Sequence, residues 1–177
     1  ASQAIFTILF MLVFIINMIS SFIYKPIMTN IGILWNNYDY KKIVKTIIRQ
    51  IITISFLTIA IIIVGNLIGL TLLGYIYGVS LNNYKGLFAL LLCFGGFAAI
   101  DVFFVIILTI IRKQKWIIVA YVTAIACIWI CMDSAVCSYG LWGAGIIYGM
   151  AMGIMMLILL FVTFYIFYKK SNSQLKN

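Results

Sequence analysis

The chain has 177 residues, of which 66% are apolar or aromatic and only 8% are charged. Soluble domains carry about a quarter charged residues, so this composition excludes an ordinary water-soluble domain and predicts a protein of the bilayer. The net charge of +9 comes from 12 Lys and Arg against three Asp, with neither Glu nor His. Most metal sites and many acid–base arrangements need those two missing residue types, so we expect no metal, no other cofactor and no catalytic residue. A basic surplus in such a chain indicates loop orientation and contact with anionic membrane lipids rather than nucleic acid.

Apolar runs follow one another along the chain, and each is about as long as a helical bilayer crossing. They are too long and too uniformly apolar for strands, and none alternates as the strands of a barrel do. We therefore expect an all-α integral membrane protein, one membrane domain over residues 1–177 with a bundle of five transmembrane helices. The predicted spans are residues 5–24, 51–77, 86–111, 116–132 and 139–168.

Polar residues separate these spans. Lys25 and Pro26 close the first span, and because apolar residues continue beyond them to Trp35, we expect a kink at the proline. Residues 38–49 predict a basic, amphipathic helix at the membrane interface. The remaining separators are a turn at residues 78–83, a basic turn at residues 112–115, a short loop at residues 133–138 and a polar tail from Lys169.

The basic residues predict the orientation of the chain. If the helices alternate in direction, eleven of the 12 Lys and Arg fall on one side, and Lys85 alone falls on the other. The positive-inside rule makes the first side cytoplasmic, which places the N-terminus outside and the C-terminus in the cytoplasm of a multi-pass cell-membrane protein. An outside N-terminus that begins at Ala1 without an initiator Met predicts a fragment of a longer protein. The alternative is a complete small protein whose first Met has been removed.

Asp101 stands near the middle of the third span, among apolar neighbours. A carboxylate at that depth costs several kcal/mol unless it faces a cavity, finds a cation or takes up a proton, so it is a candidate functional residue by default. The alternative is a structural acid that is bonded to a hydroxyl or a Lys of a neighbouring helix.

A polar stripe follows one side of the first span, because at 100° per residue its members fall within about 140°. Such a stripe predicts a wet interior, and the proline after Lys25 favours a locally opened helix of the kind that forms transporter sites. The alternative for Lys25 is a side chain that extends to the cytoplasmic interface. The stripe consists of Asn17, Ser20, Ser21, Tyr24 and Lys25.

Weaker candidates lie elsewhere in the spans. Asn66 in the second span is a possible pathway residue, although a hydrogen bond between helices explains it more simply. Glycines four residues apart predict faces on which two helices approach closely, and the run Gly145, Gly149 and Gly153 is the clearest of them. A cytoplasmic basic rim is expected to contact anionic headgroups, and it consists of Arg49, Arg112, Lys113 and Lys115.

An ordered set of short motifs resembles the C-terminal half of the polysaccharide-transporter family, over about residues 20–168. Members are flippases of lipid-linked oligosaccharides of the O-antigen and capsule type, within the superfamily that also contains the multidrug and toxic-compound exporters. The motifs are Trp35-Asn-Asn-Tyr-Asp-Tyr-Lys-Lys42, Leu72-Leu-Gly-Tyr-Ile-Tyr-Gly-Val79, Asn83-Tyr-Lys85, Gly95-Gly96, Leu108-Thr-Ile-Ile-Arg-Lys-Gln-Lys115 and Tyr139-Gly-Leu-Trp-Gly-Ala144.

The resemblance implies a fold of two six-helix lobes around a cavity, of which this chain would supply the last five helices of the second lobe. The partners would then be the missing N-terminal lobe and an undecaprenyl-diphosphate-linked oligosaccharide that crosses the cytoplasmic membrane by alternating access. The resemblance also implies cations in the cavity, for which Lys25 is the first candidate, whereas it assigns no role to Asp101. Two other functions remain open: a membrane enzyme that acts on a lipid-linked sugar, and a small structural or multimerising membrane protein.

Overall fold

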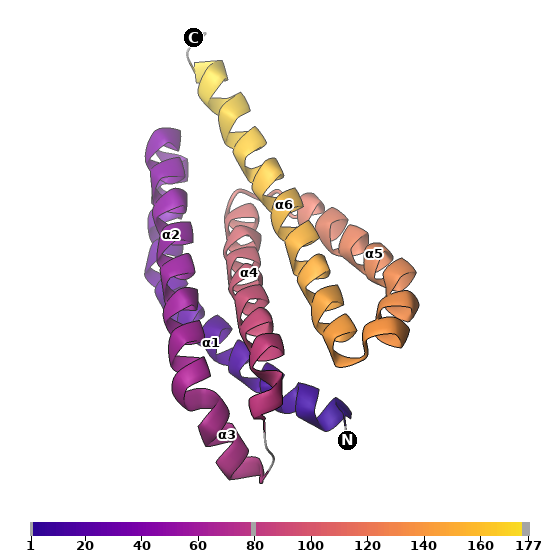
Figure 1. Cartoon of the computed structure of the whole chain (residues 1–177). Coiled ribbons are helices and arrows are strands. Elements are labelled where there is room, and N and C mark those ends of the chain that lie inside the picture. The colour runs from indigo at the N-terminus through magenta and orange to yellow at the C-terminus, as the bar shows by residue number, and fades with distance from the viewer. Residues whose placement is uncertain (1, 79–80, 175–177) are drawn as a thin grey trace.

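The computed structural model describes residues 2–78 and 81–174, and helix accounts for 95% of the structure. The prediction of an all-helical protein is therefore confirmed. Val79, Ser80 and Lys176, which the sequence assigns to a turn and to the basic tail, lie outside the described residues. The helices are α1 (Ser2–Asn36), α2 (Tyr40–Val64), the π turn η1 (Gly65–Gly69), α3 (Leu70–Tyr77), the short 3₁₀ turn η2 (Asn82–Tyr84), α4 (Lys85–Ile110), α5 (Lys115–Tyr139) and α6 (Leu141–Gln174) (Figure 1).

Four helical stretches of the described chain are long and apolar enough to cross a membrane, as a multi-pass membrane protein requires. The predicted number was five. The difference arises because the loop expected at residues 133–138 is instead the last part of α5, so that one helical stretch runs from Lys115 to Lys170. This stretch nevertheless reverses at Gly140, whose φ of +55° is readily accessible only to glycine. α5 and α6 consequently pack against each other as a hairpin (Figure 1).

The helices extend beyond the first two predicted spans as well. α1 continues through Pro26 to Asn36, because a proline removes a single donor while apolar residues beyond it, such as the fully buried Ile31, still gain from packing. The interfacial helix expected at residues 38–49 and the span at 51–77 form one helical stretch, Tyr40–Tyr77. Its regular pitch is interrupted at the π turn, where the Leu70 N–H donates to the Gly65 carbonyl five residues earlier.

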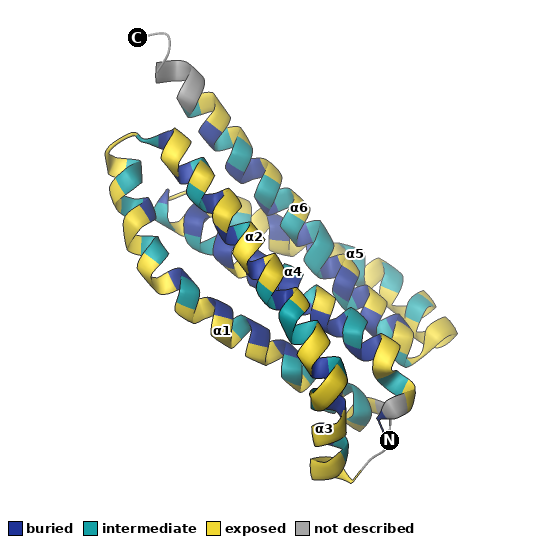
Figure 2. Cartoon of the chain, turned by 60° about the vertical axis from the view of Figure 1, so that its left-hand side comes forward, coloured by how far each residue is buried: buried dark blue, intermediate teal, exposed yellow. Residues whose placement is uncertain are grey.

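α4 is the central helix of the bundle. In its most apolar stretch of 18 residues, 61% of the residues are buried, against 17% to 33% in the corresponding stretches of the other spanning helices. Figure 2 shows the dark blue, buried residues of α4 between the surrounding helices. α4 packs against α1, α2 and α6. Exposed apolar side chains cover the outside of the bundle, as expected where lipid is the solvent.

Contacts at glycines fix the directions of the helices around α4. A Cβ at Gly95 would lie 2.8 Å from Val13 of α1, while Tyr24, further along α1, reaches Ala99 further along α4, so these two helices are parallel. α6 is also parallel to α4, because Gly145 packs on Leu87 and Gly149 on Phe94. α2 is antiparallel to α4, since Thr58 contacts Gly96 and the later Gly65 contacts the earlier Phe88 and Leu92.

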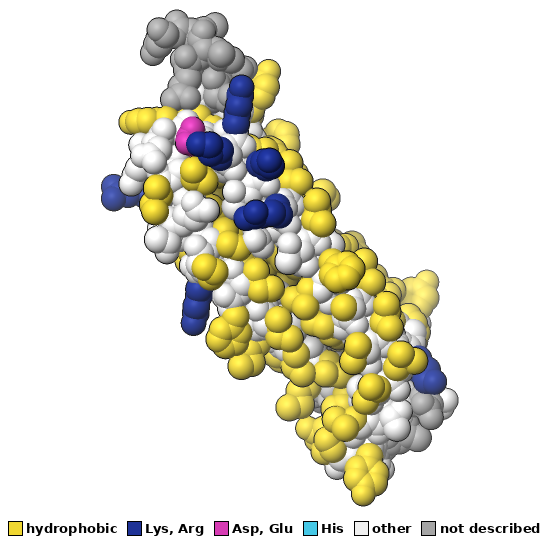
Figure 3. Space-filling view, turned by 90° about the vertical axis from the view of Figure 1, so that its left-hand side faces the viewer, with side chains coloured by type: hydrophobic (Ala, Val, Ile, Leu, Met, Phe, Trp, Pro, Cys, Tyr) yellow, Lys and Arg dark blue, Asp and Glu magenta, His cyan; other side chains and the backbone are white. Residues whose placement is uncertain are grey.

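This arrangement gathers the basic residues mainly at one end of the bundle. The end of α1, the start of α2, the α4–α5 turn and the end of α6 lie there (Figure 1). The Lys170 ammonium of α6 lies 4.2 Å from the centroid of the Trp35 ring of α1. Figure 3 shows Lys and Arg side chains at the upper end of one face and hydrophobic side chains over most of the remainder. Two residues after the ends of α1 and α4, the chain turns there at a residue other than glycine with positive φ, Tyr38 at +60° and Arg112 at +57°.

Candidate functional site

The structure divides the polar stripe of α1 into two parts. Ser20 and Tyr24 are buried against the neighbouring helices and Asn17 is half-buried, with its side-chain oxygen out of contact with solvent. Ser21 and Lys25 are exposed on the outside of the helix. We refer to the first three residues as the inner face of α1 and to the last two as its outer face.

Tyr24 connects the inner face of α1 to α4. Its hydroxyl donates a hydrogen bond of 2.6 Å to the backbone carbonyl of Ala99, and its ring centroid lies 5.3 Å from that of Phe103. These two α4 residues are one turn apart, so a single side chain spans a full turn of the partner helix. Gly95, one turn earlier on the same face, permits the close approach that brings the tyrosine within reach.

Asp101 lies in the interior of the bundle. It is 2% exposed, and neither carboxylate oxygen has a hydrogen-bond partner within the described part of the chain. Phe94 occurs two turns earlier on α4 and contacts Gly149 of α6, so the same face of α4 presents Asp101 to α6. Tyr148 of α6 connects that helix to α1, because its ring packs edge-on against Phe10 with 4.9 Å between the two ring centroids.

Other buried polar atoms in the described residues also lack a partner. Those besides Asp101 are Asn17 Oδ1, Ser20 Oγ, Gln50 Oε1 and Thr163 Oγ1. An unbonded polar group away from water costs about 1 to 3 kcal/mol, so such groups are rare unless water or a ligand meets them. We call these five residues, from α1, α2, α4 and α6, the polar interior.

Sequence inspection alone did not single out two members of the polar interior, although both follow helical spacing. Gln50 lies three residues after Ile47 and four before Ile54, and all three are buried on one face of α2. Thr163 follows Gly145 by five complete turns and therefore shares the glycine face of α6 that packs on α4. A search for polar residues on the most apolar or glycine-rich face of each span would have found both.

The structure does not bring the other predicted pathway residues to Asp101. The Lys25 ammonium lies on the outer face of α1, 5.3 Å from the Phe22 ring, and the Ser21 hydroxyl donates a 2.7 Å hydrogen bond to the Met18 carbonyl. Asn66 is half-buried within the π turn, next to Gly65, which packs near the beginning of α4. These three residues therefore lie apart from the polar interior.

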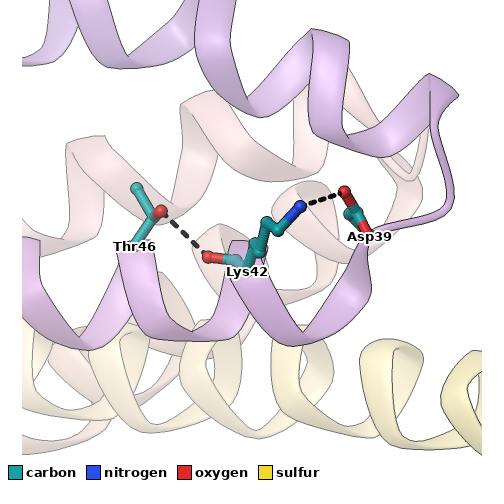
Figure 4. A network of polar contacts seen from close by, with 3 residues as sticks. All are labelled: Asp39, Lys42 and Thr46. Carbon is teal, nitrogen blue, oxygen red and sulfur yellow. Dashed lines mark hydrogen bonds and ion pairs between the residues drawn. The ribbon is translucent and has the colours of Figure 1, made fainter.

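Two residues of the basic rim, Arg49 and Lys113, line two separate grooves. One groove of about 670 Å³ lies between the end of α1 and the first half of α2, where Lys42, Lys45 and Arg49 share a face opposite Asn30. Figure 4 shows Lys42 donating to Asp39 at 2.8 Å and the Thr46 hydroxyl donating to the Lys42 carbonyl at 2.9 Å. Lys113 lines a second groove, between α5 and α6. Arg112 and Lys115, which precede and follow Lys113 in the sequence, are exposed.

Comparisons with protein-family models, with curated proteins and with solved structures find no match to this chain. In the described residues, His, Cys, Asp and Glu form no group of three that could hold a metal ion. The arrangement therefore offers polar side chains that can bind water, hydroxyl groups or a proton inside an apolar bundle, and cationic side chains that can meet an anion at one end.

Proposed function

We propose that this chain is the C-terminal part of a two-lobed membrane flippase for undecaprenyl-diphosphate-linked oligosaccharide, which acts by alternating access. The observation that carries the proposal is the polar interior, whose buried side-chain oxygens accept or donate no hydrogen bond among the described residues of an otherwise apolar bundle. A transporter needs such groups, because they meet water or the hydroxyl groups of a sugar when the helices separate, whereas a purely structural bundle is destabilised by them. The motif resemblance supplies the substrate class.

The groove between α1 and α2 suits the anionic part of such a substrate. Lys45 and Arg49 lie on one side of it, and Leu34, Ile48 and Ile52 supply apolar walls. A diphosphate would meet these cations at the basic end while its polyprenyl chain stayed in the bilayer. Lys25 lies on the same helix as Asn30 of this groove, and its outward position would let it face a second lobe, for which it remains the proposed cavity cation.

The proposal includes five bilayer crossings, with the N-terminus outside and the basic end in the cytoplasm of the cell membrane. The reversal at Gly140 supports the fifth crossing, since it divides the stretch Lys115–Lys170 into two packed helices that are each long enough to span. The shared end of the basic clusters supports the orientation.

The glycine faces favour this function over that of a multimerising protein. Gly145 and Gly149 pack on Leu87 and Phe94 of the same chain, so they are occupied within the bundle and do not offer a face to a second copy. A Cβ at Gly153 would meet no atom within 4 Å, so this third glycine contributes little to any contact. The glycine run therefore serves the packing of α6 on α4.

Flipping of a fluorescent undecaprenyl-diphosphate oligosaccharide in proteoliposomes tests the proposal. The protein, expressed from the longest reading frame that contains this chain, should move the labelled sugar to the leaflet where a soluble lectin binds it. Liposomes without protein, and protein with Asp101→Leu, serve as controls. Absence of movement by the wild-type protein would reject the flippase, and a covalently altered lipid would instead indicate an enzyme.

A further inference from the structure

A second groove lies between the start of α5 and the second half of α6. It has a volume of about 960 Å³, which makes it more than large enough for one lipid chain with part of its headgroup. Its walls are apolar and its cations lie at one end. The lining residues are Lys113, Trp116, Leu157, Ile158, Phe161, Val162, Tyr165, Ile166, Lys169 and Lys170.

The two ends of the groove differ in chemistry. Leu157, Phe161 and Tyr165 follow one another at intervals of one turn and are each more than half exposed, so they form an apolar track along α6. Lys113 in the α4–α5 turn and Lys169 near the end of α6 border the track at the basic end of the bundle, and both are exposed. Lys170 lies over the Trp35 ring and is therefore held toward α1.

This combination fits one kind of membrane component. An apolar groove between two spanning helices is filled by acyl chain when the protein is in a bilayer, because water is excluded there and the helices leave it open. The headgroup of that lipid then lies at the level of Lys113 and Lys169. Basic pockets between helices at the level of the headgroups bind anionic lipids, and each lysine contributes to the attraction. Trp116 lies near this level, where tryptophan side chains favour the membrane interface.

We propose that the groove between α5 and α6 is a binding site for an anionic phospholipid, whose phosphate-bearing headgroup lies between Lys113 and Lys169 and whose acyl chain lies along Leu157, Phe161 and Tyr165. This site is separate from the groove between α1 and α2, and it does not depend on the proposed transport activity.

Photolabelling in nanodiscs tests the site. The full chain is reconstituted with a trace of phosphatidylglycerol that carries a diazirine on its acyl chain, or with the matching phosphatidylcholine, and labelled peptides are identified by mass spectrometry. We expect labelling of residues 157–166, with about a fivefold preference for the anionic lipid. Lys113→Gln with Lys169→Gln should abolish the preference, whereas the control pair Lys41→Gln with Lys45→Gln, which removes the same charge at the same end, should retain it.

Further arms distinguish other occupants. An excess of inorganic phosphate or glycerol phosphate should leave the labelling unchanged, because the acyl chain contributes to binding; full competition would show a site for free phosphate and overturn the proposal. Equal labelling by the two lipids, or an unchanged preference in the Lys113 and Lys169 variant, would also overturn it. In a separate arm, Phe161→Cys is introduced after replacement of the four free cysteines, and disulfide-linked dimers formed on mild oxidation would show that a second copy covers the groove instead. Circular dichroism of each variant confirms that it retains helix.

Discussion

The two faces of α1 carry similar residues in different surroundings. Ser20 and Tyr24 on the inner face are buried and Tyr24 bonds to α4, whereas Ser21 and Lys25, each one position further along, are exposed on the outer face. One residue corresponds to 100° of helix, and that rotation separates the interior of a bundle from its surroundings. Polarity within a span therefore does not identify a pathway until the packing of the helix is known.

The largest expected effect is at Asp101. In Asp101→Leu, an apolar side chain of similar size replaces a buried carboxylate without a hydrogen-bond partner, so we expect the free energy of unfolding to rise by about 1 to 3 kcal/mol. Transport should nevertheless fall by more than about tenfold, because a residue retained at such a cost serves function. Thermal unfolding in detergent and the lectin-based flipping assay measure the two quantities. A less stable Asp101→Leu variant would show that the carboxylate is structural.

The second prediction concerns the packing of the inner face. In Gly95→Ala, the new Cβ would lie 2.8 Å from Val13 and 3.3 Å from Ile16, so the Val13 side chain or α1 itself must shift, and we expect a loss of stability of about 1 to 3 kcal/mol. Gly32→Ala is the matched control within α1, because its Cβ would meet no atom within 4 Å and alanine favours the helix by about 0.5 to 1 kcal/mol. Equal unfolding temperatures for the two variants would contradict the close contact between α1 and α4.

The outer face is tested at Lys25. Because its ammonium is exposed, Lys25→Ala should leave the unfolding temperature unchanged while lowering the rate of flipping about fivefold, as expected when one cation that meets an anionic headgroup is lost. Lys25→Arg keeps the charge and should retain most of the rate. If all three proteins flip the substrate equally, Lys25 only extends to the membrane interface and has no part in the pathway.

The smallest effect is expected at Tyr24. Tyr24→Phe keeps the ring against Phe103 and removes only the hydroxyl that donates to the Ala99 carbonyl, so stability should fall by about 0.5 to 1.5 kcal/mol. Chemical denaturation of the purified chain measures this loss. Tyr165→Phe, which alters an exposed tyrosine of α6, is the control and should be neutral.

The sequence was sufficient to predict the features that depend on amino-acid composition and on the spacing of apolar residues. Long apolar runs predict helices, and Asp101 is recognisable as a carboxylate far from either end of its span. The boundaries were harder, because Asp133 and Ser134 are polar and indicate a loop, yet a helix end tolerates such residues and the turn forms at Gly140 instead. Tertiary packing alone determines which side of α1 faces α4, and it also buries Gln50 and Thr163.

Cysteine labelling in membranes tests the central claim most directly, namely that the inner face of α1 opens to water during transport. After replacement of the four free cysteines, single cysteines are introduced by Asn17→Cys and Ser20→Cys on the inner face of α1, and by Phe56→Cys in α2 and Trp129→Cys in α5 on the exposed apolar surface. A charged maleimide should modify positions 17 and 20 and leave positions 56 and 129 unmodified, because lipid excludes the reagent there. Failure to modify positions 17 and 20, while a membrane-permeant maleimide does so, would contradict the account.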